Sequence, residues 1–315
     1  MKIWIDGRSD RKPVLRSHYV ESDQNMRRNA SLFGVLALFG AAVGLFLRIT
    51  ELNTLMNYRT MLMDFSAVSV LLMAVMAAVF IGFAVLAKTW KLPDFPQKYG
   101  PVFRGVGNLT VSCVCFLALL VGAYLSLRRW KSAGSVFDLL LSVLAVLAGC
   151  GWLSLSLDAF RNRKDGCTLL AAAMPILFGG LLLVGYYKSH APIPAVRFTM
   201  YPFLALCADV LAVHYIAGFT APRLHPRTSV FFSGLGAVLS ITALPGVQET
   251  EIRLYLAVFA VQLFTHGLRL LLPRAYTPAD YAAEGNEKAP EVSSAPAPAE
   301  AAETETVEAP DSSEN

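Results

Sequence analysis

One stretch of the sequence combines a membrane-spanning length of apolar residues with two ionisable side chains. Residues Phe198 to Phe219 read FTMYPFLALCADVLAVHYIAGF, with Asp209 near the middle and His214 further along. An ionisable group deep in a bilayer is costly, and such groups mark ion paths, proton relays or polar contacts between helices. Asp209 is therefore the first candidate for chemistry in this chain.

Asp209 and His214 do not form a pair on a regular helix. They are five positions apart, so their side chains point about 140° away from each other around the helix. The rise of about 1.5 Å per residue also places His214 about 7 Å nearer the cytoplasm. We therefore expect the two side chains to lie in different layers of the bundle.

Two later apolar stretches carry polar residues at matching depths. Counted along the helices, Ser240 and Gln262 fall at the depth of Asp209, whereas His266 falls at the depth of His214. A mid-depth layer and a layer nearer the cytoplasm are therefore predicted.

The last apolar stretch has a single marked face. Its residues Tyr255, Phe259, Gln262, His266 and Arg269 follow the alternating spacing of four and three that places side chains on one side of a helix. This face is predicted to look toward other helices.

These residues permit two interpretations. In the functional one, Asp209 is a protonatable or cation-binding group lining a polar path, and Gln262, Ser240, His266 and His214 are the other candidate binding residues. In the structural one, a neutral Asp209 joins helices through hydrogen bonds worth about 1 kcal/mol or less. For the two histidines, the structural alternative is hydrogen bonding or interfacial contact near the cytoplasmic edge.

The sequence contains no motif that indicates catalysis or metal binding. It lacks the HExxH, GxSxG and Walker-type glycine patterns, and its five cysteines match no zinc spacing. We therefore predict no cofactor and no metal site, and an intramembrane enzyme is the least favoured class. The N-terminal segment is too short and ordinary to indicate nucleic-acid binding.

Composition and the lengths of the apolar blocks predict the fold class. Hydrophobic residues make up 55% of the chain and charged residues 16%, outside the range of soluble domains. The apolar blocks are about 18 to 25 residues long, enough to cross a bilayer as helices. The sequence predicts an all-α, polytopic transmembrane helical bundle surrounded by lipid, with about eight spans. They are Ser31–Leu47, Phe65–Ala87, Gly107–Leu127, Val136–Leu157, Cys167–Tyr187, Phe198–Phe219, Ser229–Leu244 and Leu254–Leu272.

Some spans have distinctive local features. The seventh is short and carries several hydroxyl groups, so it is the least secure of the eight. In the first span, Gly40 and Gly44 are four residues apart, a spacing suited to close helix packing. Residues 119–124 read LLVGAY and residues 182–187 read LLVGYY. These segments indicate four repeated helical hairpins, although residues so common in membrane helices also produce such matches by chance.

Charge divides the chain into three parts and predicts its orientation. Residues 1–28 form a basic segment, residues 29–275 the bundle, and residues 276–315 an acidic tail rich in Ala, Pro and Glu that is predicted to be disordered. About nineteen of the 27 Lys and Arg residues lie on the side of the two termini. Both termini are therefore predicted to be cytoplasmic in a multi-pass protein of the cell membrane. Three cations between Arg128 and Lys131 make the orientation of the hairpin between spans three and four the least secure.

The sequence favours a transport-type or permease-like bundle with a polar mid-membrane site around Asp209. The alternative is a non-catalytic membrane scaffold, a sensor or a subunit of a larger membrane complex. Its support is the short loops and the acidic tail, for which a cytoplasmic protein partner is predicted. The solute and the oligomeric state are left open.

Overall fold

A computed structural model describes residues 12–57, 62–63, 67–90, 102–161, 168–190, 196–220 and 225–272. Residues 1–11 and the tail at 276–315 lie outside the described residues. The predicted disorder of the tail and its predicted protein partner therefore fall on a part of the chain that the structure does not address.

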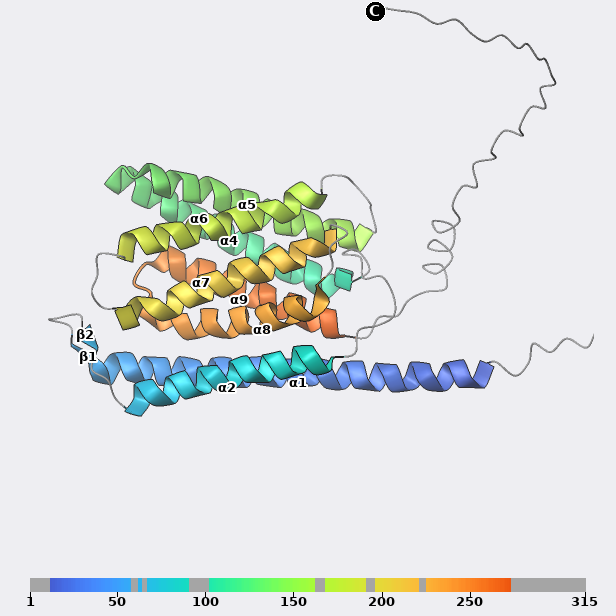
Figure 1. The fold of residues 1–315 in the computed structure, drawn as a ribbon. Helices are drawn as coiled ribbons and strands as arrows, with labels where there is room; N and C mark the ends of the chain where they lie inside the picture. Colours follow the sequence, from blue (N-terminus) through green and yellow to red (C-terminus); the bar gives the residue numbers. More distant parts are fainter. Residues whose placement is uncertain are drawn as a thin grey trace, which may run out of the picture. The chain divides into compact units, whose positions relative to one another are not determined.

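Eight helices in the described part of the chain are long and apolar enough to cross a membrane, as predicted. Each overlaps one of the predicted spans (Figure 1). They are α1 (Lys12–Leu55), α2 (Ala67–Thr89), α4 (Val106–Ala133), α5 (Val136–Arg161), α6 (Thr168–His190), α7 (Val196–Ala217), α8 (Pro226–Ala243) and α9 (Thr250–Leu271). The prediction of an all-α, eight-span membrane bundle is confirmed.

Short elements complete the helices. A two-residue antiparallel pair, β1 (Met56–Asn57) and β2 (Leu62–Met63), follows α1. Single 3₁₀ turns, η1 (Gly218–Thr220) and η2 (Leu244–Gly246), extend α7 and α8. These turns carry the helical segments to Thr220 and Gly246, just past the predicted ends of spans six and seven at Phe219 and Leu244.

The turn between α4 and α5 is set by its glycine. Gly134 adopts a left-handed conformation with φ of 70°, and its N–H donates to the carbonyl of Trp130 at 2.7 Å. A residue in this conformation is a common way to end a helix, and glycine adopts it without strain. Because α5 begins at Val136, the two helices form a tight antiparallel hairpin.

Helices α8 and α9 form the centre of the bundle. We compare the buried share of the most apolar 18 residues of each span. This share is 67% in α8 and 61% in α9, against 28–44% in the other six spans. Helix α8 packs against α1, α2, α7 and α9, so few of its side chains face lipid. The hydroxyl groups of the seventh predicted span are therefore tolerated, because other helices surround it.

The predicted small-residue face of α1 is confirmed. A Cβ atom added to Gly40 would lie 2.8 Å from Cγ2 of Val79 on α2. A Cβ atom added to Gly44 would lie 2.5 Å from Oγ1 of Thr242 on α8. These glycines therefore let α1 approach two neighbouring helices closely.

The two ends of the bundle can be distinguished by contacts between the first and last helices. The ring of Phe33, toward the start of α1, stacks on Phe264 of α9 at 6.0 Å and lies against Gly267. We call this the inner end of the bundle, and the opposite end the outer end. Each helix from α4 to α9 packs against the next one along the chain, α5 against α6 and α7 against α8 included, and α1 packs against α2. The four repeated hairpins therefore stay a prediction.

Candidate functional site

The carboxyl group of Asp209 lies in the interior of the bundle. Asp209 is on α7 and is completely buried. Its Oδ2 accepts a hydrogen bond of 2.6 Å from the Ser240 hydroxyl on α8. Its Oδ1 has no hydrogen-bond partner among the described residues. The predicted contact between Asp209 and Ser240 is therefore present, and half of the carboxyl group's bonding capacity is unused.

A glycine on α8 allows this close approach. A Cβ atom added to Gly236 would lie 2.7 Å from Oδ1 of Asp209 and 2.9 Å from Cδ1 of Leu263 on α9. On α7, Ala205 and Ala212 lie about one turn before and after Asp209, and both are completely buried. Small side chains therefore bring α7, α8 and α9 together around the carboxyl group.

Gln262 has a different partner from the one expected. Its Nε2 donates to the hydroxyl of Ser112 on α4 at 3.1 Å, and its Oε1 has no partner among the described residues. The neighbouring Leu263 is the residue that approaches Gly236 beside Asp209. Adjacent residues on a helix point in different directions, so α9 presents leucine to the Asp209 site and glutamine to α4.

Four residues from three helices form a buried set that we call the inner polar cluster. The hydroxyl groups of Ser112 on α4 and Ser156 on α5 lie 2.6 Å apart, and Nδ2 of Asn108 donates to Ser156 at 3.3 Å. With Gln262 as the fourth member, all are at most 2% exposed. Asn108, Ser112 and Ser156 were not among the residues predicted from the sequence. The spacing of four between Asn108 and Ser112, which places both on one helical face, was the pattern that could have indicated this cluster.

The two candidate histidines lie in different environments. His266 is buried, with Nδ1 2.7 Å from the backbone carbonyl of Gln262 and its ring 4.8 Å from that of Phe103. His214 is exposed and has its ring near that of Tyr215, its neighbour on α7. A similar depth in the bundle therefore does not bring the two imidazoles to one site.

The predicted inward face of α9 is confirmed by the burial of its members. Between the outer end of α9 and Gln262 lie two aromatic residues, Tyr255 and Phe259, both completely buried. Phe178 of α6 packs against both rings, and Trp152 of α5 packs edge-on against Phe259 at 5.4 Å. An aromatic layer therefore separates the inner polar cluster from the outer end.

A buried ion pair lies at the outer ends of α1 and α2. Nη1 of Arg48 is 2.6 Å from Oε2 of Glu51, and the hydroxyl of Ser69 donates to the other carboxylate oxygen at 2.7 Å. The guanidinium of Arg48 also lies 4.8 Å from the ring centre of Tyr201 on α7. Both charged residues are at most 2% exposed, although they follow the predicted end of the first span at Leu47.

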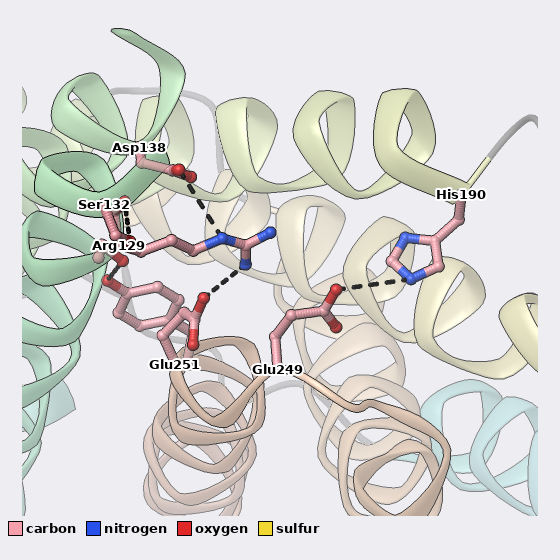
Figure 2. A network of polar contacts seen from close by, with 8 residues as sticks. Arg129, Ser132, Asp138, His190, Glu249 and Glu251 are labelled. Atoms are coloured by element: carbon pink, nitrogen blue, oxygen red, sulfur yellow. Dashed lines mark hydrogen bonds and ion pairs between the residues drawn. The ribbon is translucent and has the colours of Figure 1, made fainter. Parts of the chain in front are cut away.

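The unexpected cations of the outer loop are partly explained by a charged network (Figure 2). Nη1 of Arg129, near the end of α4, is 2.6 Å from Oε1 of Glu251 on α9. Its Nε is 3.8 Å from a carboxylate oxygen of Asp138 on α5. The positive charge of Arg129 is therefore balanced by acidic side chains on the same end of the bundle. Figure 2 also shows Glu249 and His190 in a second, neighbouring contact.

Metal ligation has no support in the described residues. Within those ranges, no three His, Cys, Asp or Glu side chains are grouped so that they could hold a metal ion. The nearest arrangement to a carboxylate site is Asp209, whose hydrogen-bond donor is a serine hydroxyl. A single buried carboxyl group of this kind is chemically able to bind a proton or a cation.

Comparisons with known proteins give no match. The chain matches no protein-family model, and no significant similarity was found to curated proteins or to solved structures.

Proposed function

We propose that this multi-pass membrane protein is a transport-type bundle in which Asp209 takes up the transported proton or cation. The observation that supports this proposal is a fully buried carboxyl group with one oxygen bonded to Ser240 and the other without a partner among the described residues. A buried carboxylate is costly unless a proton or a cation compensates it.

Binding of a proton or a cation to Asp209 would change the packing of α7, α8 and α9 around it. Its Oδ1 lies against Gly236 of α8, and Leu263 of α9 closes the same space. A proton or a cation gained at Oδ1 changes the size and charge of the group at this three-helix junction. Uptake and release would therefore favour different positions of α7 relative to α8, which is the requirement for coupling a site to transport.

The other candidate residues take separate roles in this proposal. Ser240 orients the carboxyl group through its hydrogen bond. Gln262 and His266 belong to the inner half of the path, because Gln262 joins the inner polar cluster and His266 lies one turn further toward the inner end. His214 is exposed on α7 and is assigned no role in the path.

Proton and cation flux in proteoliposomes tests this proposal. The purified full-length chain would be reconstituted with internal dyes for protons, sodium and potassium, and flux of each ion would be followed under its own imposed gradient. Asp209→Asn removes the charge with little change in shape, so we expect it to abolish flux while the protein stays monodisperse. Asp158→Asn, the same change in a half-buried aspartate at the inner end of α5, is the matched control and should retain flux.

Two results would contradict the proposal. One is equal flux in the Asp209→Asn variant and the unaltered protein, and the other is no flux of any of the three ions in the unaltered protein. If Asp209→Asn lowers expression and stability with no separable effect on flux, the carboxyl group has the structural role instead.

One structural feature favours the alternative of a non-catalytic membrane component. Helix α1 begins at Lys12, and its residues 12–25 (KPVLRSHYVESDQN) are mostly polar, so the helix is longer than its apolar part. The additional helical segment extends the inner end of α1 beyond its apolar part, where it could contact another protein. Deletion of residues 1–24 would then remove a stoichiometric co-purifying partner and leave flux unchanged. Loss of flux with an unchanged set of partners would count against this alternative.

A further inference from the structure

The turn between α8 and α9 presents a carboxylate at the outer end of the bundle. Glu249 immediately precedes α9, and its backbone carbonyl accepts from the N–H of Arg253 at 3.1 Å. The side chain of Arg253 donates to the carbonyl of Val247, which fixes the same turn. The position of Glu249 is therefore set by the backbone on both sides of it.

Two residues of α6 face this carboxylate. Tyr186 and His190 are one helical turn apart, and their rings stack with centres 4.2 Å apart. Nε2 of His190 lies 3.8 Å from Oε1 of Glu249, which is too long for a hydrogen bond. Tyr186 and Glu249 therefore both lie next to the imidazole ring of His190, one stacked on it and one near its Nε2.

Two buried polar atoms in this group lack partners. Oε2 of Glu249 and the hydroxyl oxygen of Tyr186 have no hydrogen-bond partner among the described residues. Tyr186 is only 2% exposed, and the side chain of Glu249 is 21% exposed. Buried polar atoms are bonded to a protein group, a water or a ligand in nearly all proteins, so these two atoms are available to bond a bound molecule.

The guanidinium of Arg129 in the outer network is already engaged by other carboxylates than Glu249. The guanidinium of Arg129 is bonded to Glu251 at 2.6 Å and lies near Asp138. Figure 2 shows Glu249 on the other side of this pair, facing His190. A partly desolvated carboxylate in this position favours a bound cation.

The tautomer of His190 determines which hydrogen-bonding groups the bound cation must have. Its Nδ1 lies 3.0 Å from the backbone carbonyl of Tyr186, and a carbonyl oxygen can only accept. Nδ1 is therefore the donor, and in the neutral ring Nε2 presents a lone pair. Nε2 of His190 and Oε1 of Glu249 are two acceptors close enough for one nitrogen to bond both.

We propose that Glu249, Tyr186 and His190 form a binding site for a primary ammonium group. Such a group has a positive charge and three N–H donors, which match the carboxylate, the imidazole Nε2 and the oxygen of the tyrosine hydroxyl. The site does not include Asp209, so it stands or falls separately from the proposed transport role. Its chemistry selects amines over cations that cannot donate hydrogen bonds.

Thermal melting of the purified full-length protein tests the site, with methylammonium chloride as the probe. Tetramethylammonium chloride and sodium chloride at equal ionic strength are the reference salts, since neither offers an N–H donor. We expect saturable stabilisation by methylammonium alone. Glu249→Gln and Tyr186→Phe should each weaken the apparent affinity about tenfold or more, because the first removes the negative charge and the second removes a hydrogen-bond acceptor.

Glu251→Gln is the matched control, because it removes the same charge from the neighbouring Arg129 pair and should leave the methylammonium response unchanged. If Glu249→Gln does not fold, Tyr186→Phe decides the question. The proposal is overturned if methylammonium stabilises no better than the reference salts, which means that water or any cation fills the space. It is also overturned if both site variants respond as the unaltered protein does.

Discussion

The side chains of Asp209 and Ser240 meet at 2.6 Å in the interior of the bundle although they lie 31 positions apart in the sequence. Both are completely buried. Helix α8, which supplies Ser240, is also the span with the largest buried share. The buried hydrogen bond of Asp209 on α7 is therefore made with the helix that is most shielded from lipid, where no water competes for the bond.

Gly236→Ala is expected to destabilise the bundle by about 1–3 kcal/mol, the range for overpacking a tight interior. The added methyl group would lie 2.7 Å from Oδ1 of Asp209 and 2.9 Å from Leu263. The melting temperature of the purified protein measures the effect. Gly180→Ala on α6, where no heavy atom lies within 4 Å of the added carbon, should leave the melting temperature unchanged or raise it. Equal effects of the two substitutions would contradict the tight junction around Asp209.

Glu51→Ala should be among the most destabilising single changes at the outer end. It removes the carboxylate from Arg48, which is completely buried, and breaking a buried ion pair costs about 3–5 kcal/mol. The double variant Arg48→Met with Glu51→Leu should recover most of the loss, because neither charge is then left buried.

Glu251→Ala provides the comparison for that ion pair. It breaks the pair with Arg129, whose side chain is 42% exposed, so its cost should be below about 1 kcal/mol and should shrink in high salt. Melting temperatures of Glu51→Ala, the Arg48→Met and Glu51→Leu double variant, and Glu251→Ala at low and high salt give the order of their stabilities. A loss for Glu51→Ala no larger than that for Glu251→Ala would show that the buried pair contributes little.

Ser112→Ala should destabilise the protein by about 1 kcal/mol, the scale of interhelical hydrogen bonds in membranes. The change leaves the amide of Gln262 and the hydroxyl of Ser156 without their shared partner. Adding Gln262→Leu should restore part of the loss by removing the unbonded amide. Ser154→Ala is the control, because Ser154 bonds only within its own helix, to the carbonyl of Gly151. No difference in melting temperature between Ser112→Ala and Ser154→Ala would contradict the inner polar cluster.

Labelling of single cysteines should place the inner end in the cytoplasm. In a chain with its five cysteines replaced, Gln248→Cys and Ser132→Cys lie exposed toward the outer end, and His225→Cys lies exposed at the start of α8. A membrane-impermeant maleimide should label the first two in intact cells and the third only after permeabilisation. The opposite pattern would reverse the predicted orientation, and labelling of Gln248→Cys without Ser132→Cys would place the α4–α5 hairpin differently.

Much of the fold could be predicted because a bilayer constrains each helix separately. The thickness of the hydrocarbon layer sets the length of every apolar block, so eight spans follow from hydropathy alone. Helical periodicity identified the inward face of α9, whose members from Tyr255 to His266 are buried. The spacing of Gly40 and Gly44 identified a close-packing face without naming the helices that it meets.

The pairing of polar residues could be predicted only in part. Depth along each helix placed Asp209, Ser240 and Gln262 in one layer, yet only Ser240 bonds to Asp209 while Gln262 bonds to Ser112 on α4. Depth is a single coordinate, and it leaves open the direction in which each side chain points around its helix. That direction is decided by which helices surround each other.

The sequence by itself determined the number of spans and the approximate length of their apolar parts, since these depend on local composition and on the thickness of the bilayer. The tertiary structure decided which helices are central, and with that which polar groups meet. The hydroxyl groups that made the seventh span look weak are tolerated because α8 lies inside the bundle. Arg129 is acceptable at the outer end because Glu251, 122 positions away, is brought against it. Contacts of this kind arise from packing between distant segments, which local pattern does not encode.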